Sequence, residues 1–154
     1  MPRPYSIPTR YRRNPYRNTT SDRQRIFDAV WSWFIDQQHP VCWNEDKGTC
    51  MYRSEDDSNA CAIGIFIPSC VAPSFREVTH NAATLLREND YIAVTHRIFS
   101  PELSDFLTKL QWLHDNWDRM HNTRGVPSEW TAAFRSDLIR FASHHTLTVP
   151  EPKP

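Results

Sequence analysis

Three side chains that could do chemistry stand at helical spacing in the second half of the chain: Gln111, His114 and Asp115. Positions i, i+3 and i+4 of a helix lie on one face. A half-buried histidine beside a carboxylate can act as a general base, so His114 and Asp115 are the candidate catalytic residues of a hydrolase-like enzyme. The alternative is structural: His114 hydrogen-bonds a backbone carbonyl of a neighbouring hairpin. We favour this second role, because buried polar groups normally find a partner.

A second kind of candidate site would bind an anion. Arg53 ends an apolar run, and a guanidinium group suits a phosphate or a carboxylate. The acidic residues 55–57 follow it closely, so a surface ion pair of little energy is the alternative interpretation. Arg53, Gln111 and His114 are therefore the candidate ligand-binding residues.

Other site chemistries find little support in the sequence. The chain has seven histidines and four cysteines, yet neither C-x2-C nor H-E-x-x-H occurs, so we predict no metal. The sequence contains no G-x-S-x-G, and its three glycines are too scattered to form a phosphate-binding loop, so we also predict no cofactor. Cys61 lies in an apolar run where thiols are usually inert. A hairpin with a four-residue turn would place Cys50 opposite Cys61, and we expect both thiols to be buried and reduced.

The first 18 residues differ in charge from the rest of the chain. They contain five arginines, four prolines and no acid, which leaves 13 basic and 18 acidic residues in the remainder. Arginines and tyrosines alternate in a pattern typical of an arm that pairs with phosphates and stacks on bases. The nucleic-acid candidates are Arg10, Tyr11, Arg12, Arg13, Tyr16 and Arg17. The alternative interpretation is a solvated tail, whose deletion would leave the melting temperature nearly unchanged.

Length and composition indicate one domain. The chain has 154 residues, of which 39% are hydrophobic. We expect a basic tail at 1–18, a domain at 19–147 and a proline-rich tail at 148–154. No apolar run approaches the ~20 residues needed to span a bilayer, and no secretory signal is recognisable, so we predict a cytoplasmic protein without membrane contact.

The expected fold class is α+β, a small antiparallel β-hairpin packed against three or four α-helices. The stretch 49–68 has two apolar runs on either side of the polar segment SEDDSN, a pattern typical of a hairpin. In its second strand Ile63, Ile65 and Ile67 would share one face. Residues 21–37, capped by Thr20 or Ser21, form the first expected helix.

The remaining helices are predicted from their start signals and apolar periodicity. Pro101-Glu102 opens an amphipathic helix over 101–121, and Pro127 opens the last one, which runs to about His144. A weaker helix is expected at 74–88, followed by a short extended piece at 91–94. The predicted common core is Ile63, Ile65, Phe106, Leu110, Trp117, Phe134 and Leu138.

Two motifs of the hairpin, C-x-Y-R at 50–53 and C-A-I-G-x-x-I-P at 61–68, resemble a signature of small, uncharacterised proteins of tailed phages and bacteria. The L-Q-x-x-H-D block at 110–115 and the W-x3-F helix at 130–134 resemble the same group. The resemblance covers roughly residues 21–147, on the scale of one domain. It implies no particular reaction.

The sequence therefore favours a phage-type accessory protein that acts by binding. Its expected partner is a host protein of a defence or regulatory pathway, which it would inhibit, or a small anionic ligand, which it would sequester. A nucleic-acid-binding protein that uses the basic arm is the second hypothesis, and the hydrolase centred on His114 and Asp115 is the third.

Overall fold

The structure of the protein is a computed structural model. It describes residues 15–40, 42–44, 49–50, 52, 54, 58–67, 95–115 and 127–151. The helix expected at 74–88 and the extended piece expected at 91–94 lie outside these residues, as does Trp117. Within them the protein is mostly helical, with three α-helices and a fourth helical segment at 95–98.

The first helix, α1 (Thr20–Trp31), begins one residue earlier than the sequence suggested. Its cap is Thr19, not Thr20 or Ser21: the backbone of Thr19 is extended, and its Oγ1 accepts a hydrogen bond from the Asp22 N–H at 3.1 Å. The Asp22 carboxylate in turn accepts a hydrogen bond from the Arg17 N–H at 2.7 Å. This helix buries Ile26, Phe27, Val30 and Trp31.

A wider π-helical turn, η2 (Ser32–Asp36), continues α1 and turns Phe34 into the core. The turn closes when the Gln37 N–H donates to the Ser32 carbonyl at 2.9 Å, five residues back. Gln38 then takes a positive φ of 55°, which stops the helix. The His39 ring stacks on Trp33, with ring centres 3.6 Å apart, and half-buries that indole.

The two later helices follow the prediction where they are described. A 3₁₀ turn, η5 (Pro101–Leu103), leads into α4 (Ser104–Asp115), and α6 spans Pro127–His144. The predicted continuation of α4 to residue 121 lies outside the described residues. The inward positions of α6 are all buried, namely Trp130, Phe134, Leu138, Phe141 and Ala142.

The predicted hairpin is only partly formed among the residues that the structure describes. The two-residue antiparallel ladder that the structure describes is a different pairing: it joins β1 (Trp43–Asn44), in the predicted connector, to β2 (Thr49–Cys50), so Cys50 pairs with Trp43. Across the polar turn, the Ser54 N–H donates to the Asn59 carbonyl at 3.0 Å, and the Cys61 N–H donates to the Tyr52 carbonyl at 3.1 Å. Cys61 therefore lies opposite Tyr52, and the predicted opposition of Cys50 and Cys61 is wrong.

The predicted second strand is also wrong. Residues 62–63 form a turn and Gly64–Phe66 form a 3₁₀ helix, η3, instead of an extended run. Gly64 explains the change, because its backbone presses against Tyr52: a Cβ built there would lie 1.7 Å from the Tyr52 carbonyl oxygen. The chain turns at this contact, and Ile63, Phe66 and Ile67 become buried while Ile65 stays half-buried.

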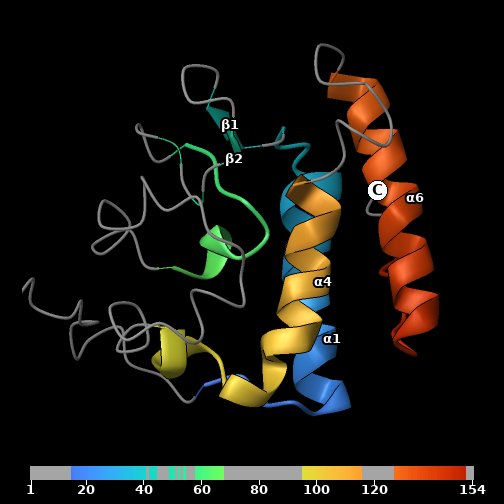
Figure 1. Ribbon diagram of the computed structural model, residues 1–154. Helices are drawn as coiled ribbons and strands as arrows, with labels where there is room; N and C mark the ends of the chain where they lie inside the picture. The colour runs from blue at the N-terminus through green and yellow to red at the C-terminus, as the bar shows by residue number, and fades with distance from the viewer. Residues whose placement is uncertain are drawn as a thin grey trace, which may run out of the picture.

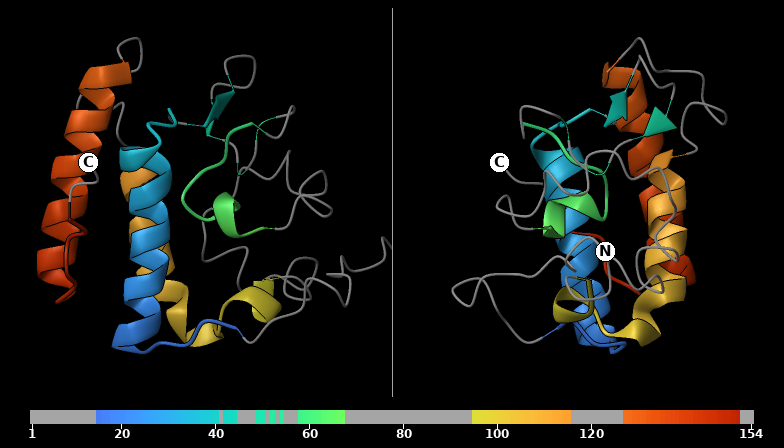
Figure 2. Two further views of the ribbon diagram at one scale, coloured as in Figure 1. Left: turned by 180° about the vertical axis from the view of Figure 1, so that it is seen from behind. Right: turned by 60° about the vertical axis from the view of Figure 1, so that its left-hand side comes forward.

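Helices α1 and α4 separate the small hairpin region from α6. In Figures 1 and 2, α1 and α4 lie between α6 on one side and β1, β2 and η3 on the other. Five predicted core residues share one buried cluster: Ile63, Phe106, Leu110, Phe134 and Leu138. Ile65 packs against the edge of that cluster. None of the described helices is long and apolar enough to cross a membrane.

The chain beyond α6 is held to α1 by one side chain. The Gln24 amide donates to the Thr148 carbonyl and accepts from the Thr148 N–H, both at 2.8 Å. Leu147 and Val149 pack against the core on either side of this contact. The first residues of the predicted C-terminal tail, 148 and 149, are thus part of the packed structure.

We predict that Thr146→Gly stabilises the protein. Thr146 has a φ of 57° in the turn that closes α6, where the Leu147 N–H donates to the Ala142 carbonyl at 2.8 Å. A β-branched residue is strained in this left-handed region, whereas glycine is not. Removing the strain should raise the free energy of unfolding by about 1 kcal/mol in urea titrations. Thr146→Ala retains a Cβ and should gain clearly less; an equal gain would contradict the strain argument.

Candidate functional site

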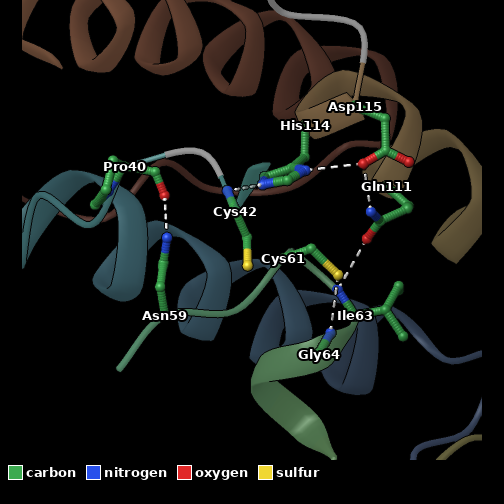
Figure 3. Close-up of polar contacts among 9 residues, drawn as sticks. All are labelled: Pro40, Cys42, Asn59, Cys61, Ile63, Gly64, Gln111, His114 and Asp115. Carbon is green, nitrogen blue, oxygen red and sulfur yellow. Dashed lines mark hydrogen bonds and ion pairs between the residues drawn. The ribbon is translucent and has the colours of Figure 1, made fainter. Parts of the chain in front are cut away.

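The three chemistry-bearing residues predicted on one helix face do meet, on the inward side of α4. Gln111 is 3% exposed and His114 is fully buried, while Asp115, the last described residue of α4, is half-buried. The Gln111 Nε2 donates to Asp115 Oδ1 at 2.7 Å, and His114 Nδ1 lies 2.9 Å from the same oxygen (Figure 3). One carboxylate oxygen therefore organises both neighbouring side chains.

The second ring nitrogen of His114 reaches the residues ahead of β1. The Cys42 N–H donates to His114 Nε2 at 3.2 Å (Figure 3). Because a backbone N–H can only donate, Nε2 carries the lone pair and the ring proton sits on Nδ1, where it is donated to Asp115. The ring is neutral in this arrangement. The sequence predicted that His114 would bond a backbone carbonyl of the hairpin. Its observed backbone partner is instead the N–H of Cys42, in the connector before the hairpin.

Gln111 ties α4 to the apolar turn at 61–67. Its Oε1 accepts a hydrogen bond from the Ile63 N–H at 3.0 Å. The side-chain amide thus satisfies a buried backbone donor at the turn into η3. Gln111 and His114 are interior connectors between the 42–67 segment and α4, which supports the structural interpretation of this motif. Such buried groups offer no surface to an external substrate.

The thiols beside this network are buried. Neither Cys42 nor Cys61 forms a disulfide bond, and the Cys61 Sγ accepts a hydrogen bond from the Gly64 N–H at 3.3 Å. Burial raises the pKa of the Cys61 thiol well above its usual range, and the nearby Asp115 charge raises it further. Cys61 is therefore a protonated, unreactive thiol at neutral pH. The side chain of Cys50 lies outside the described residues.

Most of the other predicted site residues also lie outside the described part of the chain. They are Arg53, Arg10, Tyr11, Arg12 and Arg13. Arg17 is exposed.

Tyr16 is docked on the body of the protein. Its N–H donates to the Ile98 carbonyl at 2.8 Å, and its carbonyl accepts from the Ser100 N–H at 2.7 Å. The ring packs on Phe66 and Phe99, with the Arg25 guanidinium 5.1 Å from its centre. This ring already has stacking partners within the protein.

We therefore predict that deleting residues 1–18 destabilises the protein, contrary to the expectation from composition. Deletion removes both backbone hydrogen bonds and the half-buried Tyr16 ring, which should lower the free energy of unfolding by about 2–4 kcal/mol. Tyr16→Ala should account for about half of that loss in the full chain. Deleting residues 1–14 leaves these contacts in place and is the matched control. Equal stability of the two truncated proteins would contradict the docking.

A hollow of about 600 Å³ lies between α4 and α6, which pack side by side in Figure 1. We call it the α4–α6 groove. Its walls include Lys109, Trp112 and Leu113 from α4, and Arg140, Phe141, His144 and His145 from α6 and the turn that follows. Trp112 is 52% exposed, although large aromatic side chains are usually mostly buried.

Charges line the rim of this groove. Arg140 forms an ion pair with Asp137, which is 2% exposed. The positive charge of Arg140 therefore balances the negative charge of this buried carboxylate. Lys109 and His144 are exposed. Burial lowers the pKa of His145, and the neighbouring His144, Lys109 and Arg23 lower it further, so His145 is mostly uncharged at pH 7. The groove is apolar inside and mildly cationic at its edge.

Sequence reasoning missed this groove. One signal was present: Lys109 and Trp112, three residues apart, share the polar side of an otherwise regular amphipathic helix. An aromatic residue on that side is not needed for the core. The opposite wall comes from a helix about thirty residues away, and nothing in the sequence pairs the two walls.

Neither the described residues nor the comparisons with known proteins point to a metal site or a family. Among the described residues, no group of three or more histidine, cysteine and acidic side chains is placed to hold a metal ion. Comparisons of the chain with protein-family models, with curated proteins and with solved structures find no match. The likeness to small phage and bacterial proteins thus rests on the sequence motifs alone.

Proposed function

We propose that this protein is a non-enzymatic binding protein, of the phage-type accessory kind, whose α4–α6 groove takes up a small anionic component of the host cell. The observation that carries the proposal is the half-exposed Trp112 on the wall of a hollow of about 600 Å³. Pockets of this volume suit small molecules, and such pockets are usually apolar with a few polar groups that orient the ligand.

The groove has the rigidity that a binding site needs. Its two walls are regular helices whose inward faces are anchored in one core, through Phe106 and Leu110 on α4 and Phe134 and Leu138 on α6. Side chains on packed helices keep their geometry without the entropy cost of ordering a loop. Ligand binding therefore requires little rearrangement of the backbone.

The histidine network favours binding over hydrolysis. His114 is fully buried, and both of its ring nitrogens are engaged, by the Cys42 N–H and by Asp115. A general base must come within hydrogen-bond reach of the proton it removes, and a buried, fully bonded ring does not. His114 and Asp115 serve the stability of the domain in this proposal.

The proposal is tested by amide NMR spectra of the ¹⁵N-labelled protein with a fragment panel of neutral, cationic and anionic compounds. We expect anionic compounds of the panel to shift amide signals of 108–113 and 137–145 together. Trp112→Ala should weaken the binding of those compounds about tenfold, because an exposed aromatic anchor carries much of the energy of a small site. The fold should persist, since exposed substitutions seldom change stability by more than ~0.5 kcal/mol.

Ile139→Ala is the matched control. Ile139 is the other large hydrophobic side chain that is exposed among the described residues, at 37%, and it belongs to α6 without lining the groove. This variant should bind like the unmodified protein. A panel in which no anionic compound shifts the groove amides, or in which Trp112→Ala binds as well as Ile139→Ala, would overturn the proposed function.

A further inference from the structure

The lining of the α4–α6 groove is unusually rich in rings. Trp112, Phe141, His144 and His145 all contribute to it. Phe141 is 7% exposed and His145 half-buried, with ring centres 4.2 Å apart, so these two rings form a packed inner surface. Trp112 stands on the opposite helix and is far more exposed. Flat ligands gain from such walls, because aromatic rings favour stacked or edge-on contacts with other rings.

The charges around these rings favour an anion. The charged side chains of the lining are Lys109, Arg140 and Asp137, and burial lowers the pKa of the His145 ring beside them. Asp137 is buried against Arg140, so a ligand at the rim meets mainly the Lys109 ammonium, the outer part of Arg140, which is 70% exposed, and the His144 ring. Charge-assisted hydrogen bonds from such donors are about twice as strong as neutral ones.

We infer that the groove binds an aromatic anion: a small molecule in which a planar ring carries a phosphate or carboxylate group. The ring lies against Trp112 and Phe141, and the anionic group reaches Lys109 and His144 at the rim. This inference rests on the proposed function and adds the chemical class of the ligand. The volume of about 600 Å³ accommodates one molecule of this kind.

Three probes separate the two parts of the inference: 1-naphthyl phosphate, 1-naphthol and methyl phosphate. The first carries both a ring and an anion, the second only the ring and the third only the anion. Dissociation constants come from amide shifts of the groove residues at pH 7.5. We expect 1-naphthyl phosphate to bind about tenfold more tightly than either other probe, the equivalent of one strong polar contact.

Variants assign each part of the probe to its side chain. Lys109→Gln should weaken 1-naphthyl phosphate about fivefold and leave 1-naphthol unchanged, because only the anion contacts the ammonium group. Trp112→Ala should weaken both ring-bearing probes. Arg97→Gln removes a charge at an exposed position outside the groove lining and is the control for general electrostatics. It should change the affinity for neither 1-naphthyl phosphate nor 1-naphthol.

The outcomes distinguish this inference from the proposed function. If 1-naphthol binds as tightly as 1-naphthyl phosphate, the inference that the ligand is an anion is overturned. If methyl phosphate binds as tightly as 1-naphthyl phosphate, the inference that the ligand is aromatic is overturned. If all three probes fail while other anionic fragments shift the groove amides, the ligand class is wrong and the proposed binding function stands. If nothing shifts those amides, both are wrong.

Discussion

Gly64→Ala is expected to abolish the native fold at room temperature, or to lower the free energy of unfolding by more than about 4 kcal/mol. An added methyl group would lie 1.7 Å from the Tyr52 carbonyl oxygen and 2.7 Å from the carbonyl carbon. Both atoms belong to the backbone, and the same Tyr52 carbonyl accepts the hydrogen bond from the Cys61 N–H. Relieving the clash would separate these segments and expose Ile63, which is buried beside them.

Ala62→Gly is the control for this substitution. Ala62 is also fully buried in the same turn, so its change alters a methyl group at a similar depth without creating a clash. It should cost only about 1 kcal/mol, through lost burial and added freedom of the unfolded chain. The measurement is urea unfolding followed by circular dichroism. A Gly64→Ala protein with the urea midpoint of Ala62→Gly would contradict the close approach of residues 52 and 64.

The second large effect is expected for His114→Phe. Phenylalanine retains the ring contacts with Phe34 and Trp130 but leaves the Cys42 N–H without its acceptor and Asp115 without the Nδ1 donor. A buried donor left unpaired costs about 1–3 kcal/mol, and a second lost hydrogen bond adds to this, so the free energy of unfolding should fall by about 3 kcal/mol.

Asp115→Asn is the matched comparison for the histidine. An asparagine retains an oxygen that can accept from Gln111 and His114, and the Asp115 side chain is 31% exposed, so the cost should stay near 1 kcal/mol or below. Binding of groove probes should survive in both variants, measured at a temperature where each is folded. Loss of probe binding by His114→Phe without loss of stability would point to a direct role of the histidine and against the connector described above.

Part of this architecture could be predicted from local sequence alone. Proline and acidic residues at the start of a periodic segment located the beginning of α6, and the apolar positions of that helix fixed its buried face. The common face of Gln111, His114 and Asp115 likewise follows from helical spacing. These features depend on residues within one or two turns of one another, so the sequence determines them before any tertiary contact forms.

Other features were decided only by tertiary structure. The alternating isoleucines at 63, 65 and 67 match a strand, yet Gly64 meets the Tyr52 backbone and Gln111 takes the Ile63 N–H, so the segment winds into a 3₁₀ helix. The acceptor that the Cys42 N–H finds in His114 lies 72 residues away. The groove needs Trp112 on one helix and Phe141 on another. Each of these features depends on where two segments far apart in the sequence meet. Side-chain packing in the folded protein sets the distance between such segments, and the local sequence pattern does not.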